Sequence, residues 1–343
     1  MQNVQVGIAG ATGYLGAEAV RFLVHHPQVE LRLLASTSAA GKPYSKVNPE
    51  FQGVVDQPLD ALAPETLARC DVVLLATPHG VAADLVPRIF ALDPAVKVID
   101  LSGDHRLRDP LEAKRVYGHA PAALDEAVYG LPELNRDAIR RARLVANPGC
   151  YPTASALAAL PLVKAGIVRT DRVVVDAKSG VSGAGRDPGA LYHFPEANEN
   201  IRAYKVGEHR HEPEIAQTFS VAAGRAVRVT FTPHLVPMNR GILATVYMEP
   251  EGALLPTAEV SDLYRKAYAS EPFVRVVEDP NVLAVRGTNY CDVRCVPVRS
   301  GLYVAVSAID NLAKGGSAQA VQNLNLMCGF PETMGLPRVG GGP

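Results

Sequence analysis

Cys150 has the sequence setting of a catalytic nucleophile. It lies in the run Asn-Pro-Gly-Cys-Tyr-Pro-Thr at residues 147–153, directly before an apolar stretch that predicts a helix. Pro152 suits a first helical turn, so Cys150 is expected at the helix N-terminus, where the dipole favours the nucleophilic thiolate. The alternative is a small buried residue, which is what most thiols in proteins are. That alternative fits the other cysteines better: Cys70, Cys291, Cys295 and Cys328.

His209 is the candidate acid and base. It belongs to the run Gly-Glu-His-Arg-His-Glu-Pro-Glu at residues 207–214, which is dense in titratable groups. A histidine near a cysteine can act first as a base and then as an acid. A metal site is one alternative, but no third ligand stands at a recognisable spacing, so no metal is expected. A charged loop exposed to solvent is the other alternative.

Arg202 is a candidate for binding a substrate carboxylate. If residues 198–205 are helical, Arg202 and His209, seven positions apart, fall on one face. An arginine there would hold a carboxylate through two parallel hydrogen bonds. The alternative is a surface helix with ordinary charges.

A glycine-rich turn predicts a dinucleotide site near the start of the chain. Residues 10–16, Gly-Ala-Thr-Gly-Tyr-Leu-Gly, follow the first predicted strand and open the first predicted helix. Glycines allow a tight turn and a close approach to a pyrophosphate, and the helix N-terminus offers N–H groups. The spacing G-x-x-G-x-x-G departs from the usual G-x-G-x-x-G, so a purely structural turn is the alternative. The expected contacts are Gly10, Thr12, Gly13, Tyr14, Leu15 and Gly16.

The end of the second predicted strand favours NADP over NAD. An NAD site usually places a carboxylate there, to bind the ribose 2′-hydroxyl. This chain has Ser36, Thr37 and Ser38, followed by Lys42, so hydroxyls and a cation are available for a 2′-phosphate. Ser36 and Ser38 are therefore candidate cofactor residues. The alternative is a serine-rich loop that contacts nothing.

Arg106 is a candidate phosphate ligand. It ends the run 102–106, which follows a predicted strand, and open α/β sheets bind ligands at the carboxyl ends of their strands. A surface salt bridge is the alternative. Asn147 is a second phosphate candidate, and Pro78 lies after another predicted strand, at the same kind of edge.

Two further loops have the composition of ligand-binding segments. Ser179 and Gly180 begin a glycine–serine loop that would either wrap a ligand or serve as a flexible connection. Asn311 would either bring its amide to the cofactor or cap the last helix.

The elements that must position these residues change in pattern after Asn147. Before it, apolar strands alternate with helices, which predicts a doubly wound parallel sheet of the Rossmann type. After it, strands with few intervening helices predict a mixed or antiparallel sheet in an α/β domain. The predicted domains are residues 1–148, with a C-terminal helical segment at 312–343 packing back on them, and residues 149–311.

The composition excludes several classes of function. The chain has 343 residues and a net charge of −1, which gives no electrostatic basis for binding nucleic acid or an acidic membrane. No apolar stretch is long enough to span a bilayer, and no secretory signal is expected. Five cysteines at irregular positions do not form a disulfide framework, so a reducing cytoplasm is predicted.

Five motifs together carry a resemblance that covers nearly the whole chain. They are residues 10–16 (GATGYLG), 147–153 (NPGCYPT), 179–186 (SGVSGAGR), 207–215 (GEHRHEPEI) and 309–315 (IDNLAKG). In this order they resemble the N-acetyl-gamma-glutamyl-phosphate reductases of arginine biosynthesis.

The resemblance implies a fold, roles and an assembly. It implies a Rossmann domain and a second domain like those of aspartate-semialdehyde and glyceraldehyde-phosphate dehydrogenases. It implies Cys150 as nucleophile, His209 as acid and base, and Arg202 as the ligand of the substrate's α-carboxylate. Homo-oligomerisation, as a dimer or tetramer through the second domain, is also implied. A related group acts on a carrier-bound aminoadipyl phosphate in lysine biosynthesis, but residues 147–153 and 179–186 look like the arginine branch.

The expected reaction is an NADPH-dependent reduction of an acyl phosphate to an aldehyde. The Cys150 thiolate would expel phosphate and form a thioester, which NADPH would reduce. Two other classes stay open. A Cys–His hydrolase or transferase needs no nicotinamide, and the turn at residues 10–16 argues against it. A non-catalytic NADP-binding redox sensor needs no base beside its cysteine, and the run at 207–214 argues against that.

Overall fold

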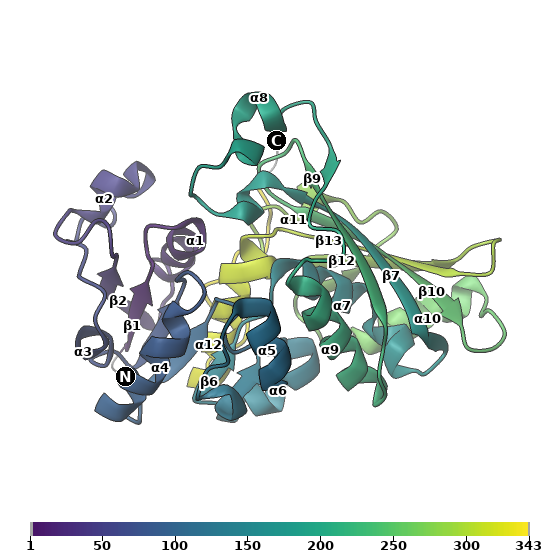
Figure 1. Ribbon diagram of the computed structural model, residues 1–343, viewed down its shortest axis with the longest axis horizontal. Coiled ribbons are helices and arrows are strands. Elements are labelled where there is room, and N and C mark those ends of the chain that lie inside the picture. Colours follow the sequence, from purple (N-terminus) through teal and green to yellow (C-terminus); the bar gives the residue numbers. More distant parts are fainter. Residues whose placement is uncertain (1–2, 342–343) are drawn as a thin grey trace. The chain divides into compact units, whose positions relative to one another are not determined.

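The computed structural model describes residues 3–341, which divide into two compact units (Figure 1). Of these residues, unit 1 comprises 3–148 and 316–336, and unit 2 comprises 149–315 and 337–341. The extreme ends of the predicted domains, residues 1–2 and 342–343, lie outside the described residues.

Unit 1 is built on a six-stranded parallel sheet in the order β2-β1-β3-β4-β6-β5. The strands are β1 (Val4–Ala9), β2 (Val29–Ala35), β3 (Val72–Leu75), β4 (Lys97–Asp100), β5 (Ala127–Tyr129) and β6 (Leu144–Ala146). Their apolar side chains are buried on both faces of the sheet, as β3 shows with four consecutive buried residues. The predicted doubly wound parallel sheet is confirmed.

The chain reverses its direction of travel across this sheet at β1. Strand β2 pairs with one edge of β1 and β3 with the other, so the chain first moves to one side of β1 and then crosses to its other side. In open α/β sheets such a switch point, at the carboxyl ends of the strands, is where ligands bind. The glycine-rich turn follows β1, and residues 76–80 follow β3.

Helices complete unit 1. They are α1 (Tyr14–Leu23), α2 (Tyr44–Val47), α3 (Pro64–Leu67), α4 (Val81–Leu92), α5 (Pro110–Tyr117), α6 (Pro132–Arg141) and α12 (Ala318–Cys328). The C-terminal helix α12 packs against α1, α6 and β4. It is almost entirely buried and carries an unusual number of amide side chains, which bond to neighbouring carbonyl groups.

Unit 2 is built on a seven-stranded mixed sheet in the order β11-β12-β13-β10-β7-β9-β8. The strands are β7 (Val168–Gly180), β8 (Arg202–Ala203), β9 (Val229–Val236), β10 (Ile242–Pro250), β11 (Val274–Val276), β12 (Cys291–Pro297) and β13 (Tyr303–Ile309). Two of its pairs, β7 with β9 and β11 with β12, are parallel, and the others are antiparallel. The predicted mixed sheet is confirmed.

Buried and half-buried residues alternate along the central strands of unit 2, so only one face of the sheet packs into the core. The helices of the unit are α7 (Cys150–Lys164), α8 (Phe194–Ala197), α9 (His211–Ala223), α10 (Thr257–Ala267) and α11 (Val282–Val285). Helix α7 lies beside α9 and against strands β10 and β13 (Figure 1). Every residue of α7 from Tyr151 to Val163 is buried.

Two local predictions differ from the structure. The helix predicted from the apolar stretch after residues 147–153 begins earlier, at Cys150, because Gly149 provides an extended N-cap and Pro152 is tolerated in the first turn. Residues 198–205 are not helical: they contain the short strand β8, and Glu199 and Lys205 have positive φ angles of 55° and 47°. Among the described residues, no helix is both long and apolar enough to cross a membrane.

Candidate active site

Cys150 is the first residue of α7, as the sequence predicted. Its side chain is half-buried, and the preceding Gly149 has the extended conformation of a helix N-cap. No residue of the first turn of α7 is acidic, and the positive end of the helix dipole faces the thiol. This setting favours the thiolate.

The backbone just before Cys150 is held by a buried carboxylate. The Gly149 N–H donates to Glu214 Oε1 at 2.8 Å, and Glu214 has no exposed surface. Glu214 lies in the first turn of α9, three residues after His211. The sequence run that contains the histidines therefore also fixes the start of the nucleophile's helix.

An aromatic cluster connects the start of α7 with His209. Tyr151 packs edge-on against His209 and against Phe231 of β9, at centroid distances of 5.6 and 5.1 Å. His211 lies beside His209 at 4.9 Å. Tyr204, which follows β8, completes the cluster at 5.4 Å from His209. The candidate acid/base thus lies next to the residue that follows the nucleophile.

Hydrogen bonds determine which nitrogen of His209 carries the proton. The backbone N–H of His211 donates to His209 Nδ1 at 3.1 Å, so Nδ1 is an acceptor and a neutral ring carries its hydrogen on Nε2. His209 Nε2 lies 3.4 Å from the Tyr204 hydroxyl, which donates to the Tyr151 hydroxyl at 3.2 Å. Tyr151 in turn donates to the His234 carbonyl at 3.2 Å. His209 Nε2 is therefore a donor.

Burial keeps His209 neutral. Burial, together with the positive charges of Arg210 and Lys205, lowers the pKa of His209 to about 3. Burial is also the main reason that the pKa of the Tyr204 hydroxyl is raised, and a Cys150 thiolate nearby adds to that rise. The thiol, Tyr204 and His209 thus form one electrostatically connected group.

The lowered pKa of His209 predicts acid-sensitive folding. The unfolded chain takes up a proton at this ring below about pH 6.5, its usual value, whereas the folded chain does not until about pH 3. Stability should therefore fall as pH falls through this window, and His209→Asn should reduce the loss. Urea unfolding at pH 7, 6 and 5 measures it, with the exposed His193→Asn as control. Equal pH dependence in wild type and His209→Asn would contradict the prediction.

Arg202 begins the short strand β8, two residues before Tyr204, which contacts His209. Tyr204 extends the pairing of β8 with β9 through its N–H to the Pro233 carbonyl, so side chains 202 and 204 project to the same side. Arg202 is half-buried and lines a small crevice, with one guanidinium N–H donating to the Glu196 carbonyl at 3.2 Å. The strand, rather than the helix predicted from sequence, relates Arg202 to the His209 group.

The two phosphate candidates have protein partners in unit 1. Arg106 is buried, and its Nε and Nη2 donate to the carbonyls of Asn147 and Leu101, both at 2.8 Å. The Asn147 side chain donates to the Gly316 carbonyl at 3.2 Å and accepts from Asn323 at 3.0 Å. These bonds fix the backbone and the side chain of Asn147, which lies three residues before Cys150 in the sequence. Phosphate binding by either residue stays a prediction.

The glycine-rich turn fits a dinucleotide. Gly10 has φ = +74°, and a Cβ there would lie 2.3 Å from the Ala76 carbonyl oxygen. A Cβ on Gly16 would lie 2.2 Å from the Gly10 carbonyl oxygen, so the turn itself requires both glycines. Gly13 differs, because the nearest atom to its Cβ position is 3.6 Å away. The structure thus has room for a side chain at Gly13, at the start of α1, where a pyrophosphate would approach.

Two further features of unit 1 suit this ligand. The first turn of α1 has no acidic side chain, so its N–H groups and dipole are available to an anion. Thr77 Oγ1, after β3, is buried without a hydrogen-bond partner among residues 3–341. The Ser36 hydroxyl is buried and lies 3.3 Å from the Thr12 hydroxyl, whereas Ser38 is exposed, as Lys42 is. Ser38 is therefore better placed than Ser36 for a charged group in solvent.

Gly13→Ala separates a ligand site from a structural turn. The substitution meets no internal clash, so the melting temperature should stay within about 2 °C of wild type. The added methyl group would occupy space that a pyrophosphate needs, so the Kd for NADPH should rise about tenfold or more. Fluorescence titration with NADPH measures the effect. Unchanged affinity would mean that this glycine does not face the ligand.

The remaining cofactor candidates also have internal contacts. Ser179 is buried and donates to the Gly180 carbonyl at 3.0 Å, and a Cβ on Gly180 would lie 2.8 Å from the Arg240 nitrogen. Asn311 accepts from the Gly241 N–H at 2.6 Å and donates to Ser182 at 3.0 Å. Pro78 is exposed after β3. Cofactor contacts by these residues stay predictions.

Comparison with known proteins identifies the family. The chain is 50% identical to N-acetyl-gamma-glutamyl-phosphate reductase of Symbiobacterium thermophilum over 346 aligned residues, which cover 98% of this chain and 99% of that one. It is 48% identical to the reductase of the same name in Pseudomonas syringae pv. syringae, with 98% and 99% coverage. The chain belongs to the N-acetyl-gamma-glutamyl-phosphate reductase family.

Domain models match both parts of the chain, and solved structures share its fold. The NAD binding domain of semialdehyde dehydrogenase matches residues 5–142, and the dimerisation domain of semialdehyde dehydrogenase matches residues 150–311. Aspartate semialdehyde dehydrogenase II of Vibrio cholerae, complexed with ASA, has a TM-score of 0.73 at 19% identity over 96% of this chain and 99% of that one. The NADP complex of the Candida albicans enzyme has a TM-score of 0.72 at 16% identity, with 95% and 99% coverage. At these identities the likeness concerns the fold.

Sequence reasoning missed several side chains around Cys150 and His209 in this member of the reductase family. Glu214 had a detectable signal, because it lies in the histidine run at i+3 from His211 on a helix. Tyr151 adjoins the nucleophile in sequence. Tyr204 and Phe231 had no local signal, since the pairing of β8 with β9 brings them to the cluster.

Proposed function

We propose that the chain converts N-acetyl-glutamyl 5-phosphate to N-acetyl-glutamate 5-semialdehyde and phosphate with NADPH, through a thioester on Cys150. Family membership makes it an oxidoreductase of arginine biosynthesis. One structural observation carries the chemical proposal: Cys150 opens a helix whose next residue, Tyr151, is hydrogen-bonded through Tyr204 to His209 Nε2. A nucleophile and a fixed donor thus lie in one group.

In the first step the sulfur of Cys150 replaces phosphate at the carbonyl carbon of the substrate. The thiolate attacks the carbonyl carbon of the acyl phosphate, and the carbonyl π electrons move to oxygen. When the oxyanion collapses, the bond from carbon to the phosphate oxygen breaks and phosphate leaves with the electron pair. A thioester remains, and no proton has been gained or lost at the carbonyl oxygen.

In the second half of the reaction Cys150 becomes the leaving group. NADPH, when bound, supplies the hydride that reduces the thioester carbonyl. Cys150 then leaves as a thiolate as the aldehyde carbonyl re-forms. The start of α7 stabilises the departing thiolate as it stabilised the attacking one.

We assign His209 the role of a neutral donor to the carbonyl oxygen in both halves. Neither oxyanion has to be protonated for its step to balance, so a fixed N–H suffices. A neutral imidazole with a lowered pKa that polarises a carbonyl is an established enzymatic pattern. This differs from the base expected from sequence, because His209 Nδ1 accepts from His211 and Nε2 carries the hydrogen.

NADP is the proposed cofactor, and the residues expected to hold it belong mainly to unit 1. The turn at residues 10–16 would bind the pyrophosphate through N–H groups at the start of α1. Ser38 and Lys42, both exposed after β2, would bind the 2′-phosphate, with Ser36 supporting the turn. Unit 2 would carry catalysis, with Ser179, Gly180 and Asn311 in supporting contacts.

Homo-oligomerisation through unit 2 is also proposed. The sheet face not covered by α7 and α9 carries half-buried apolar side chains, including Leu243, Tyr247, Val304 and Val306. Such a face is typical of a subunit interface.

All five cysteines are thiols, and none forms a disulfide, which supports the predicted cytoplasmic location.

The decisive experiment is the reverse reaction, in which phosphate and aldehyde are separate substrates. N-acetylglutamate semialdehyde, phosphate and NADP should give reduced cofactor, followed by its absorbance, with a higher kcat/KM for NADP than for NAD. Omitting phosphate should abolish the signal. Turnover only with a carrier-bound aminoadipate semialdehyde would favour the lysine branch. NADP binding without turnover would favour a redox sensor, and hydrolysis without cofactor would favour a Cys–His hydrolase.

Arg202→Lys tests the substrate carboxylate. A lysine keeps the charge but cannot form the bidentate pair, so KM for the semialdehyde should rise about ten- to a hundredfold, while KM for phosphate stays near wild type. Arg225→Lys, an exposed arginine of unit 2 paired with Glu251, is the matched control. A rise in KM for phosphate instead would show that Arg202 binds the other end of the substrate.

A further inference from the structure

The α-carbon of Gly315 packs so closely against Cys150 that a side chain would not fit between them. A Cβ built on Gly315 would lie 2.8 Å from Cys150 Cβ, 3.2 Å from Cys150 Cα and 3.2 Å from Ile309 Cδ1. Side chains do not approach one another this closely. Because Cys150 Cα and Cβ are fixed by the helix backbone, they cannot rotate away as the end of a long side chain can.

The backbone at Gly315 does not itself require glycine. Gly315 does not have a positive φ angle, and it lies in a helical segment, the π-helix Ala313–Ser317. Alanine is the better residue for helical backbone, so local preference would favour it. The contact with Cys150 and Ile309 is what excludes a side chain.

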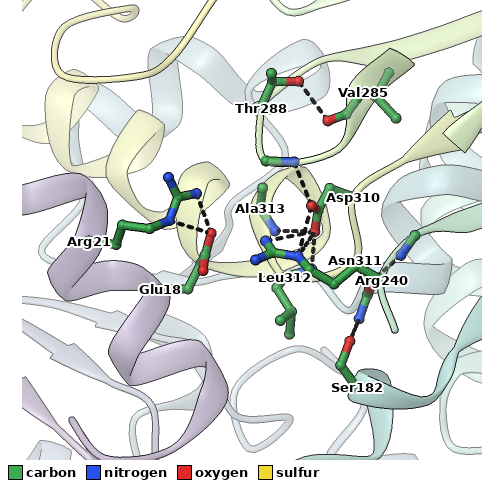
Figure 2. Close-up of polar contacts among 12 residues, drawn as sticks. Glu18, Arg21, Ser182, Arg240, Val285, Thr288, Asp310, Asn311, Leu312 and Ala313 are labelled. Atoms are coloured by element: carbon green, nitrogen blue, oxygen red, sulfur yellow. Dashed lines mark hydrogen bonds and ion pairs between the residues drawn. The ribbon is translucent and has the colours of Figure 1, made fainter. Parts of the chain in front are cut away.

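The turn that carries Gly315 is fixed by a buried carboxylate. Asp310 has no exposed surface and accepts hydrogen bonds from three backbone N–H groups and from Arg240 (Figure 2). The distances are 2.7 Å from Gly287, 2.9 Å from Leu312 and 3.1 Å from Ala313, and the ion pair with Arg240 is 3.0 Å. The Gly315 N–H donates to the Asp310 carbonyl at 2.9 Å, which closes the turn.

A second side chain of the same turn holds it to neighbouring segments. Asn311 accepts from the Gly241 N–H just before β10, and it donates to Ser182 after β7 (Figure 2). On the opposite side of the contact, the Gly149 N–H is held by Glu214 and the body of α7 is buried. Neither partner of the contact can retreat without breaking hydrogen bonds of buried groups.

We propose that Gly315 is a positioning residue for Cys150: the turn held by Asp310 and Asn311 brings its bare α-carbon against the start of α7 and so sets where the thiol lies. This inference rests on the proposed role of Cys150 as nucleophile. Displacement of a reacting group by about 1 Å can cost about a hundredfold in rate, so a methyl group here should affect the chemistry more than substrate binding.

Gly315→Ala is the test, with Gly252→Ala as the matched control, because a Cβ on Gly252 meets no atom within 4 Å and its backbone is not in the positive-φ region. In the reverse reaction Gly315→Ala should lower kcat at least tenfold and leave KM for NADP within twofold. The alkylation rate of Cys150 by iodoacetamide, read by peptide mass, should also fall at least threefold. Gly252→Ala should match wild type in all three measurements.

A compensating variant distinguishes crowding from general damage. Ile309→Val removes the Cδ1 atom that lies 3.2 Å from the built Cβ, so it should restore part of the kcat and of the alkylation rate in the Gly315→Ala background. If Gly315→Ala proves insoluble, Asp310→Asn, which weakens the hydrogen bonds that hold the same turn, should lower both kcat and the alkylation rate of Cys150.

Wild-type alkylation and kcat in Gly315→Ala would overturn the inference, and so would a fall in kcat that leaves the alkylation rate of the folded protein unchanged. Alkylation needs no substrate, so this result is independent of the proposed reaction. Failure of the proposed reaction has a different signature, which is retained turnover when Cys150 itself is removed.

Discussion

Replacing Cys150 with alanine should lower kcat for the reverse reaction by about 10⁴-fold or more, while the Kd for NADPH changes less than about twofold. The thiol forms the covalent bond to substrate, and without it only binding and oxyanion stabilisation remain. Cys150→Ser should be almost as inactive, because a hydroxyl is far less acidic than a thiol. Absorbance of the reduced cofactor measures turnover, and fluorescence measures binding.

The control for Cys150 is another cysteine of similar exposure at the opposite end of a helix. Cys328 is half-buried at the last residue of α12, so Cys328→Ala should leave kcat unchanged. Alkylation should also be selective: burial raises the pKa of Cys70 to about 11 and of Cys295 to about 12, and it raises the pKa of Cys328. Substantial turnover by Cys150→Ala would remove the thioester mechanism.

His209→Asn should lower kcat by about 10²- to 10³-fold, the usual cost of losing one donor to a developing oxyanion. Asparagine keeps an oxygen that can accept the His211 N–H and removes Nε2. His209→Gln, which extends an amide nitrogen further, should retain more activity than His209→Asn. We expect kcat to be highest in wild type, lower in His209→Gln and lowest in His209→Asn, while the Kd for NADPH stays constant.

His26 supplies the control for this histidine. It is also buried with a lowered pKa, caused mainly by burial, but it lies in unit 1 and bonds to Asn325. His26→Asn should change kcat less than about twofold. If His209→Asn and His209→Gln were equally impaired, donation from Nε2 would not be the function of this residue.

The parts of the fold that were predictable depend on local patterns. Largely apolar segments such as residues 4–9 and 29–35 indicate strands, and β1 and β2 have these bounds. Their alternation with helices predicts a parallel sheet. The position of Cys150 at a helix start followed from Pro152 and from the apolar stretch after residue 153, which are both local signals. Turn chemistry and periodicity are local, so a sequence displays them directly.

The arrangement around His209 was not predictable, because it depends on distant pairings. Tyr204 reaches Nε2 only because β8 pairs antiparallel with β9, and a two-residue strand leaves no periodic signal. The helical arrangement considered for residues 198–205 is absent for the same reason, because this segment pairs with β9. Likewise, no pattern indicates that the sequence-distant Gly315 abuts Cys150.

The burial of α7 on every side bears on how the protein fluctuates. Amide hydrogens at residues 153–163, apart from Pro161, which has none, should exchange with deuterium only through global unfolding, since no face of this helix is exposed. Residues 185–201, which are mostly exposed, should exchange through small local openings. The nucleophile's support would then belong to the most slowly exchanging part of unit 2, while the loop that leads to Arg202 opens and closes many times during the lifetime of the folded state.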